Sequence, residues 1–158
     1  MPTALMEALA AHLDGVFAGP NGDYPAVLEA LSEIGVAQAA WKPAPDSNSI
    51  WQIADHLAAS KEWAIDMLDR GEASSPVWTE PAGDERAWQA SLAGLKDAHA
   101  RLKDSLEQVQ EDILFNRPLL PDWPQTQLEF MLSWAAHEAF HAGQIDYLKG
   151  LQAGKPAQ

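Results

Sequence analysis

The sequence of 158 residues contains no cysteine. This absence excludes disulfide bonds, thiolate metal sites and cysteine nucleophiles from the chain. Any metal ion must therefore be held by histidine, aspartate or glutamate, and any thiol that takes part in a reaction must come from another molecule. The absence also fits a cytoplasmic protein.

Basic residues are scarce as well. The chain has 10 Lys and Arg against 23 Asp and Glu, so its formal net charge is −13. Such a charge repels phosphate backbones and anionic lipid surfaces, and we expect neither nucleic acid nor a membrane as a partner. No apolar run approaches the roughly 20 residues of a membrane span, and the start, "MPTALMEALAAHLDG", lacks the features of a signal peptide. We therefore expect a soluble, cytoplasmic protein.

No segment has the alternating pattern of a β-strand. Proline and glycine gather in a few short stretches, and the longer segments between them have the periodicity of amphipathic helices. The predicted helices cover residues 3–18, about 24–33, 49–70, 84–110 and 126–151. Four long helices and one short one predict an all-α four-helix bundle, as a single domain over residues 1–158. The stretch 71–84 is long enough to permit a crossover, so the order of connection stays open.

The stretch "HEAFHAGQI", which begins at His137, matches the H-E-x-x-H pattern of zinc proteases. His137 and His141 are four residues apart on a predicted helix, so their side chains lie on one face and can share one ion. The same face carries Phe130 and Trp134 before the pair and Leu148 after it, which directs the pair into the bundle. A buried histidine pair must lose its protons or find partners, and a divalent metal satisfies both needs. Two ordinary helix histidines, satisfied by water or carboxylates, are the alternative.

A zinc protease of this pattern takes its third ligand from a later histidine or glutamate. The chain after His141, "AGQIDYLKGLQAGKPAQ", contains neither, and no strand is predicted that would bind an extended peptide. A third ligand must therefore lie upstream. The best candidate is His56, which follows Ile53 and precedes Ser60 at the edge of a core-facing helix stripe. A lone histidine in such a place is more often a core residue with satisfied hydrogen bonds, so both interpretations stay open.

Two motifs together resemble a known family. The segment Trp41–Ser60, "WKPAPDSNSIWQIADHLAAS", is similar to a family pattern in which a Trp or Arg and a Pro precede a Ser-Ile helix start and an H-L pair. The stretch "HEAFHAGQI" is similar to the closing H-x-x-x-H-x-G-Q-I of the same family. This family is the DinB-like superfamily of DNA-damage-inducible proteins, which includes YfiT-type and thiol-dependent transferase members. The resemblance covers roughly residues 3–151 and implies a four-helix bundle, commonly with crossover connections and often dimeric.

The resemblance also implies one divalent ion held by three histidines. Carried over residue by residue, the family's first histidine falls on His56 and its closing pair on His137 and His141. Imidazole ligands suit zinc and nickel best, with manganese or iron possible. Three ligands on one side of an ion leave its other positions open, as in a catalytic site.

Other polar and aromatic residues have less definite roles. Glu138 is expected to be solvated or to bridge helices, with support of a metal ligand as the alternative. His99 occupies the one polar position in the apolar stripe of the predicted helix 84–110. Two roles fit it equally well: a core histidine with satisfied hydrogen bonds, or an acid or base that lines the pocket. His12 is expected at the periphery, and the seven tryptophans are expected mainly to fill the core and anchor loops. The candidates for lining the pocket are His99, Trp134, Ser60 and Gln144.

A metal ion with open positions supports two kinds of reaction. It lowers the pKa of bound water for hydrolysis, or it binds a thiol as the thiolate. The resemblance implies the second, in which a small cellular thiol such as bacillithiol or mycothiol is transferred to an electrophile. The first hypothesis is therefore a metal-dependent thiol S-transferase and the second a metal-dependent hydrolase, with no catalytic residue assigned. The alternative is a non-enzymatic metal-binding stress-response protein. Coordination of the ion by His99 as a fourth ligand would favour this alternative.

Overall fold

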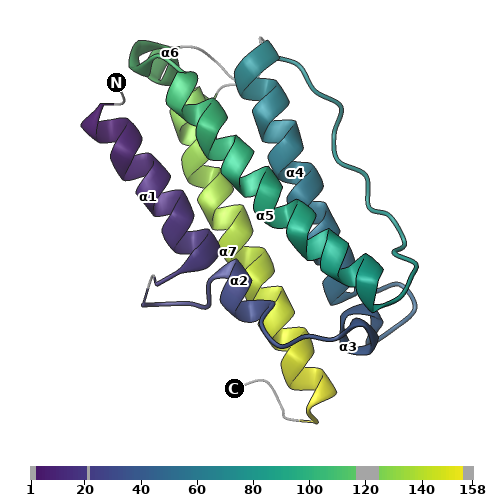
Figure 1. Ribbon diagram of the computed structural model, residues 1–158. Helices are drawn as coiled ribbons and strands as arrows, with labels where there is room; N and C mark the ends of the chain where they lie inside the picture. The colour runs from purple at the N-terminus through teal and green to yellow at the C-terminus, as the bar shows by residue number, and fades with distance from the viewer. Residues whose placement is uncertain (1–2, 21, 117–124, 155–158) are drawn as a thin grey trace.

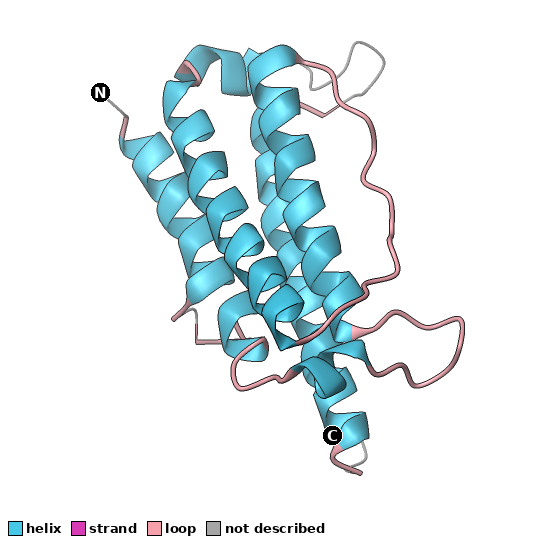
Figure 2. Cartoon of the chain, turned by 45° about the vertical axis from the view of Figure 1, so that its right-hand side comes forward, coloured by secondary structure: helices cyan, strands magenta, loops and turns pink. Residues whose placement is uncertain are grey.

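We describe the protein from a computed structural model, which places residues 3–20, 22–116 and 125–154. In these residues there are seven helices and no strand (Figures 1 and 2), so the predicted all-α class is confirmed. The four long helices are α1 (Ala4–Ala18), α4 (Ile50–Arg70), α5 (Glu85–Gln108) and α7 (Gln127–Gln152). The three short ones are α2 (Val27–Ala30), α3 (Val36–Ala40) and α6 (Glu111–Asn116). None of the helices in this part of the chain has the length and apolar character of a membrane span.

The long helices begin and end where the sequence provides caps. The Ser49 hydroxyl accepts a hydrogen bond from the Gln52 amide at 3.1 Å, and the Gln52 side chain accepts one from the Ser49 amide at 3.0 Å. This reciprocal pair satisfies two amide groups that a helix start otherwise leaves free. Gly71 ends α4 in the left-handed conformation (φ +75°), where a Cβ atom would be unfavourable. Asp84 and Thr126 also accept a capping hydrogen bond, at the starts of α5 and α7, so these predicted helix starts are confirmed.

Beside the four long helices, the described residues form three short helices where the sequence predicted one. The segment predicted over residues 24–33 forms only α2, and Glu33 just after it takes a left-handed backbone conformation (φ 60°) that does not continue a helix. Helix α6 begins only after Val109 has taken an extended conformation (ψ 134°) at the end of α5. The three short helices have 4, 5 and 6 residues, which is too few to show a helical period in the sequence.

The long helices are connected through a crossover. In Figure 1, α1 runs downward, α4 and α5 both run upward, and α7 runs downward. The parallel helices α4 and α5 are joined by residues 71–84, here called the strap, which returns along the length of the bundle. Its 14 extended residues can span about 46 Å, which exceeds the length of about 32 Å of a helix of 21 residues. The strap is the kind of crossover that the family resemblance implied.

The apolar core is divided into two clusters along the bundle. Leu57 and Leu95 belong to one cluster, while Ala64 and Leu102, two turns further along the same helices, belong to the other. Lys61 lies between the two clusters on α4, and its whole residue is buried. A layer of polar side chains therefore separates the two halves of the core.

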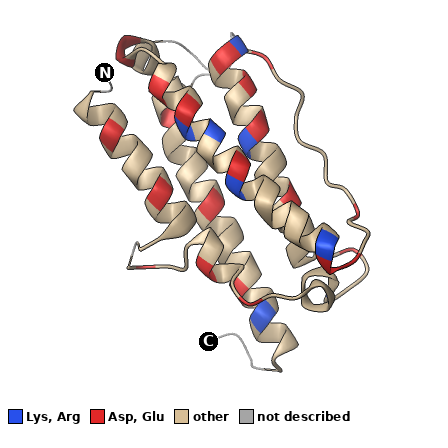
Figure 3. Ribbon diagram, in the orientation of Figure 1, with Lys and Arg blue, Asp and Glu red and all other residues tan. Residues whose placement is uncertain are grey.

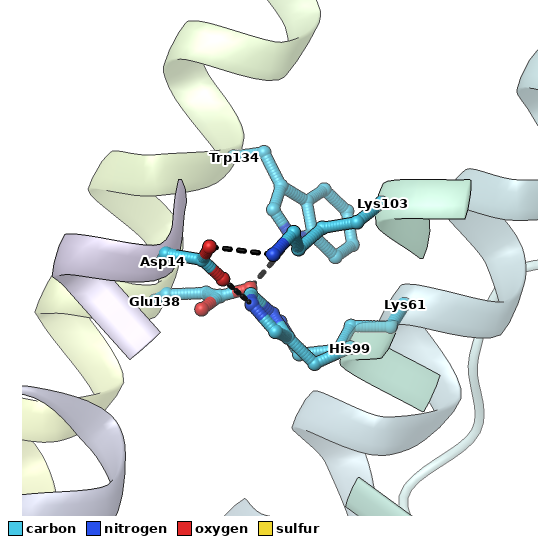
Figure 4. Close-up of polar contacts among 6 residues, drawn as sticks. All are labelled: Asp14, Lys61, His99, Lys103, Trp134 and Glu138. Carbon is cyan, nitrogen blue, oxygen red and sulfur yellow. Dashed lines mark hydrogen bonds and ion pairs between the residues drawn. The ribbon is translucent and has the colours of Figure 1, made fainter. Parts of the chain in front are cut away.

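This polar layer connects all four long helices (Figure 4). Lys61 of α4 forms an ion pair with Glu138 of α7, and its Nζ lies 3.1 Å from Nδ1 of His99 on α5. The other ring nitrogen of His99 lies 2.9 Å from Oδ1 of Asp14 on α1. Trp134 of α7 donates from Nε1 to Glu138 at 2.9 Å. His99 is therefore a core histidine with partners on both ring nitrogens, and Glu138 has the inter-helix role that was one of its expected roles.

Both members of the central ion pair are almost completely removed from water. The side chains of Lys61 and Glu138 are 1% and 2% exposed. Burial lowers the pKa of the Lys61 amine, while the charge of Glu138 opposes that shift. The ammonium group also lies 4.5 Å from the centre of the Phe17 ring, whose face attracts cations. Each charge is tolerated in the core because the other is beside it.

Replacing Lys61 with methionine should lower the free energy of unfolding by about 3–5 kcal/mol, because the Glu138 charge would remain buried without its partner. Urea denaturation at pH 7 measures this loss. The control is Arg101→Met, which removes solvent-exposed ion pairs with Glu62 and Asp97 and should cost no more than about 1 kcal/mol. A Lys61→Met, Glu138→Leu double variant should regain most of the loss. A single Lys61→Met variant as stable as the wild type would contradict a structural role for the pair.

Candidate metal centre

Three histidines from two helices converge on one point. His56 lies on α4, and His137 and His141 lie one turn apart on α7. The Nε2 atom of His137 is 3.3 Å from that of His56 and 3.0 Å from that of His141. A tetrahedral ion bound at about 2.0–2.1 Å to each imidazole holds its ligand nitrogens about 3.3–3.4 Å apart. The two distances from His137 are close to this value, and the ligand atoms of the three residues all lie within 4.8 Å of one another, so the group could hold a single transition-metal ion.

The orientation of His141 shows which of its nitrogens can bind an ion. Its Nδ1 lies 2.7 Å from the Oε1 atom of Gln144, one turn further along α7. Because an amide oxygen only accepts hydrogen bonds, Nδ1 carries the proton and the lone pair of Nε2 faces the other two histidines. Among the described residues, Nδ1 of His56 and Nδ1 of His137 are buried without a hydrogen-bond partner. The Nε2 atoms of the three rings face one another instead, so these are the atoms that could bind a shared ion.

The protonation of the three histidines suits a metal site. Burial, followed by the neighbouring His141, lowers the pKa of His56 to about 4. Burial, followed by His141, His56 and Lys61, lowers the pKa of His137 to about 4 as well. Burial also lowers the pKa of His141. The imidazoles are thus neutral near pH 7, which is the form that binds a metal ion.

Aromatic side chains surround the three histidines. The Trp134 ring centre lies 5.2 Å from that of His137, where the helical spacing placed it. Trp78 lies on the strap and stacks on His56, with ring centres 4.0 Å apart and planes inclined by 7°. The sequence prediction missed Trp78, because the segment around it has no periodicity and gives no sign of its neighbours. Trp123 lies outside the described residues.

The other residues proposed for the pocket fall in two places. The hydroxyl oxygen of Ser60 lies 3.5 Å from Nε2 of His56, at the limit of a hydrogen bond, and Gln144 contacts His141 as described. His99 lies in the polar layer instead, with Asp14 and Lys61 as its partners. The group of His, Asp and Glu side chains at the site consists of the three histidines, as far as the structure describes the chain. His12 is exposed on α1, as expected.

The fold and the site together define a class of protein. It is an all-α helix bundle in which two facing helices present three neutral imidazoles that could hold one metal ion. The chain belongs to the DinB superfamily, whose family model matches residues 23–145. This match extends from the segment before α2 to beyond His141, so it includes all three histidines. No curated protein and no solved structure matches the chain.

The free energy of unfolding of the metal-free protein should fall as the pH is lowered from 6.5 to about 4. In this range the unfolded chain binds protons at His56 and His137 that the folded chain does not, so acid favours unfolding. Above pH 6.5 both states carry neutral imidazoles and this penalty disappears. Denaturation in EDTA at several pH values measures the slope. His56→Asn should flatten it, and the exposed His12→Asn should not; equal slopes in all three proteins would contradict the assignment.

Removing the side chain that orients His141 should weaken metal binding. Gln144→Ala is expected to reduce zinc affinity by about 10- to 100-fold, because the imidazole loses the acceptor that fixes its proton on Nδ1. Gln144→Glu keeps an acceptor there and should remain close to the wild type. Competition with a chromophoric chelator measures the affinities, with Gln89→Ala, at an exposed position of α5, as the control. Equal zinc affinity of Gln144→Ala and wild type would exclude this role for Gln144.

Proposed function

We propose that this protein binds one divalent transition metal through His56, His137 and His141 and acts as a metal-dependent S-transferase. Its co-substrate would be a small cellular thiol of the bacillithiol or mycothiol type. The observation that carries the proposal is the convergence of three neutral imidazoles without a fourth His, Asp or Glu in the group that the described residues form. Three protein ligands leave a position of the ion free for a substrate.

The metal, when bound, would hold the thiol sulfur as a thiolate at neutral pH. The chain itself contains no cysteine, so the sulfur must come from the second substrate. The transfer would join this sulfur to a carbon atom of the electrophile, and the bond from that carbon to its leaving group would break. The leaving group departs with the bonding electron pair, and the proton of the thiol passes to water. The balance requires no oxidant or reductant.

The residues of the chain would have distinct parts in this reaction. Gln144 fixes the ring of His141 through a hydrogen bond of 2.7 Å. Trp134 and Trp78 cover parts of His137 and His56 and keep water from those sides. Glu138 is not free to serve as a general base, since its carboxylate is paired with Lys61 in the core. This arrangement favours thiol transfer over hydrolysis by a mechanism of the zinc-protease type.

Several broader properties belong to the same proposal. Imidazole ligands favour zinc or nickel, and manganese or iron can also occupy such a site. We propose that residues 1–158 form one domain that works in the cytoplasm, which is consistent with the absence of cysteine. The family resemblance supports a homodimer and a role in the stress response. A metal-binding protein without enzymatic activity is the competing interpretation, and the experiment below separates the two.

The purified protein, without a histidine tag, should contain about one equivalent of a transition metal. It should accelerate the reaction of bacillithiol or mycothiol with iodoacetamide, and a chelator should return the rate to the uncatalysed value. His56→Ala should lose both metal and activity, because two imidazoles on one helix do not complete the site. His12→Ala, on the exposed face of α1, is the control and should keep both.

Two other outcomes would change the assignment. Metal binding without thiol consumption, with either thiol and each candidate metal, would support the non-enzymatic interpretation. Full metal content in His56→Ala would remove the three-histidine site. Elemental analysis by mass spectrometry provides the metal content in each case, and the loss of free thiol provides the rate.

A further inference from the structure

The strap places a tryptophan beside the three histidines. Trp78 stacks on one face of His56 at 4.0 Å, and its ring centre lies 6.1 Å from that of His141 at an angle of 62°. The strap has no helix or strand of its own and runs along the bundle between the ends of α4 and α5 (Figure 1). Trp78 therefore belongs to the surroundings of the candidate metal centre although it lies outside the helices that carry the histidines.

The position of Trp78 is defined by an anchor two residues further along the strap. Glu80 accepts a hydrogen bond from Nζ of Lys42 at 2.6 Å and from Nε2 of Gln52 at 3.2 Å. Two residues of extended chain cover about 6.6 Å, and the four residues between Gln52 and His56 on α4 cover about 6 Å. The hydrogen bond between Glu80 and Gln52 thus places Trp78 level with His56 along the bundle. The stacking of the Trp78 ring on the His56 ring follows from this alignment.

A second exposed aromatic ring lies beside His141. The ring centre of Phe140 lies 5.3 Å from that of His141, at an angle of 68°. Trp78 is 40% exposed and Phe140 is 63% exposed, so each keeps a large part of its ring open to solvent. Exposed apolar groups at the rim of a polar site are typical of places where ligands bind. The two rings are available to contact a molecule that approaches the histidines.

The charges near the site limit what kind of molecule this can be. The basic side chains that the described residues place close by are already paired, Lys42 with Glu80 and Lys61 with Glu138. Figure 3 shows acidic residues spread over the long helices and the strap, with fewer basic residues between them. A carboxylate or phosphate would find no free cation among these partners. An uncharged or cationic molecule with a flat apolar body fits the two rings better.

We propose that Trp78 and Phe140 form an aromatic subsite at the entrance of the metal centre, which binds the flat, uncharged body of an aromatic or conjugated electrophile. The proposal rests on the proposed function in that it names the class of the second substrate. Trp78 would present its outer face to this body while its inner face stacks on His56, and Phe140 would offer its exposed ring beside His141. The strap is the specificity-determining segment, and the helices supply the metal ligands.

Binding of a flat probe that cannot react tests the subsite. The probe is 1,3-dinitrobenzene, which has no leaving group, and its dissociation constant is measured by ligand-observed NMR on zinc-loaded protein in excess zinc. Trp78→Ala should weaken binding by about tenfold, because the stacking surface is lost, and Trp78→Phe should restore most of it. The control is Trp41→Ala, since Trp41 is 37% exposed but lines a separate hollow with Lys149 and Gln152. This control should bind the probe like the wild type.

The opposite results would overturn the proposal. An unchanged dissociation constant in Trp78→Ala would remove Trp78 from the subsite, and an equal loss in Trp41→Ala would show that the probe binds exposed tryptophans without selection. Tight binding of cyclohexanone, a non-planar ring of similar size, would contradict recognition of flat molecules.

The test also separates the subsite from the proposed activity. Probe binding through Trp78 without any consumption of thiol would retain the subsite and remove the transferase. Thiol consumption with iodoacetamide, together with probe binding that is the same in Trp78→Ala as in the wild type, would support the transferase activity and contradict the subsite. With 1-chloro-2,4-dinitrobenzene as electrophile, the proposal predicts a KM in Trp78→Ala that rises several times more than the KM for iodoacetamide, which has no aromatic ring.

Discussion

The ion pair between Lys61 and Glu138 is the constraint on which the positions of the functional side chains depend. Burying either charge alone costs several kcal/mol, so α4 and α7 can pack only in a register and rotation that bring the two together. Glu138 directly follows His137, and Lys61 follows Ser60, which lies one turn after His56 on the same face. The register that satisfies the charges is therefore also the register in which His56 meets His137. The same packing of α4 against α7 therefore determines both the ion pair of the core and the candidate metal site.

The same ion pair explains why the letters H-E-x-x-H have a different meaning here from their meaning in a zinc protease. A residue that follows His137 on a helix is rotated by about 100° from it. In this bundle the rotation takes the Glu138 carboxylate into the polar layer, where Lys61 and Trp134 bind it. The histidines of α7 face His56 of α4, while the glutamate faces the polar layer of the core. The motif thus supplies two candidate ligands and one structural charge, and no free base.

Much of this arrangement could be predicted from local signals in the sequence. Ser49, Gly71 and Asp84 fix helix ends through short-range hydrogen bonds and backbone preferences, so the periodic pattern and the caps agree with the observed helices. The convergence of the histidines was harder to predict, because His56 is separated from His137 by 81 residues. The absence of a ligand after His141 made His56 a candidate, and the family resemblance favoured it over an ordinary core histidine. Lys61 gave no signal at all. In the sequence it resembles a solvated lysine at the edge of an amphipathic helix, and its buried partner lies 77 residues away.

The three histidines are held by parts of the structure that differ in rigidity. His141 is fixed by Gln144 within its own helix, and His137 lies against Trp134 of the same helix. His56 is covered by Trp78, which depends on the strap and on its anchor at Glu80. Segments without secondary structure tolerate changes that a packed core does not. Substitutions in the strap can therefore alter the wall of the site while the ligands, fixed by the Lys61–Glu138 register, stay in place. In the function proposed above, affinity for the metal and preference for the second substrate would then be set by separate parts of the chain.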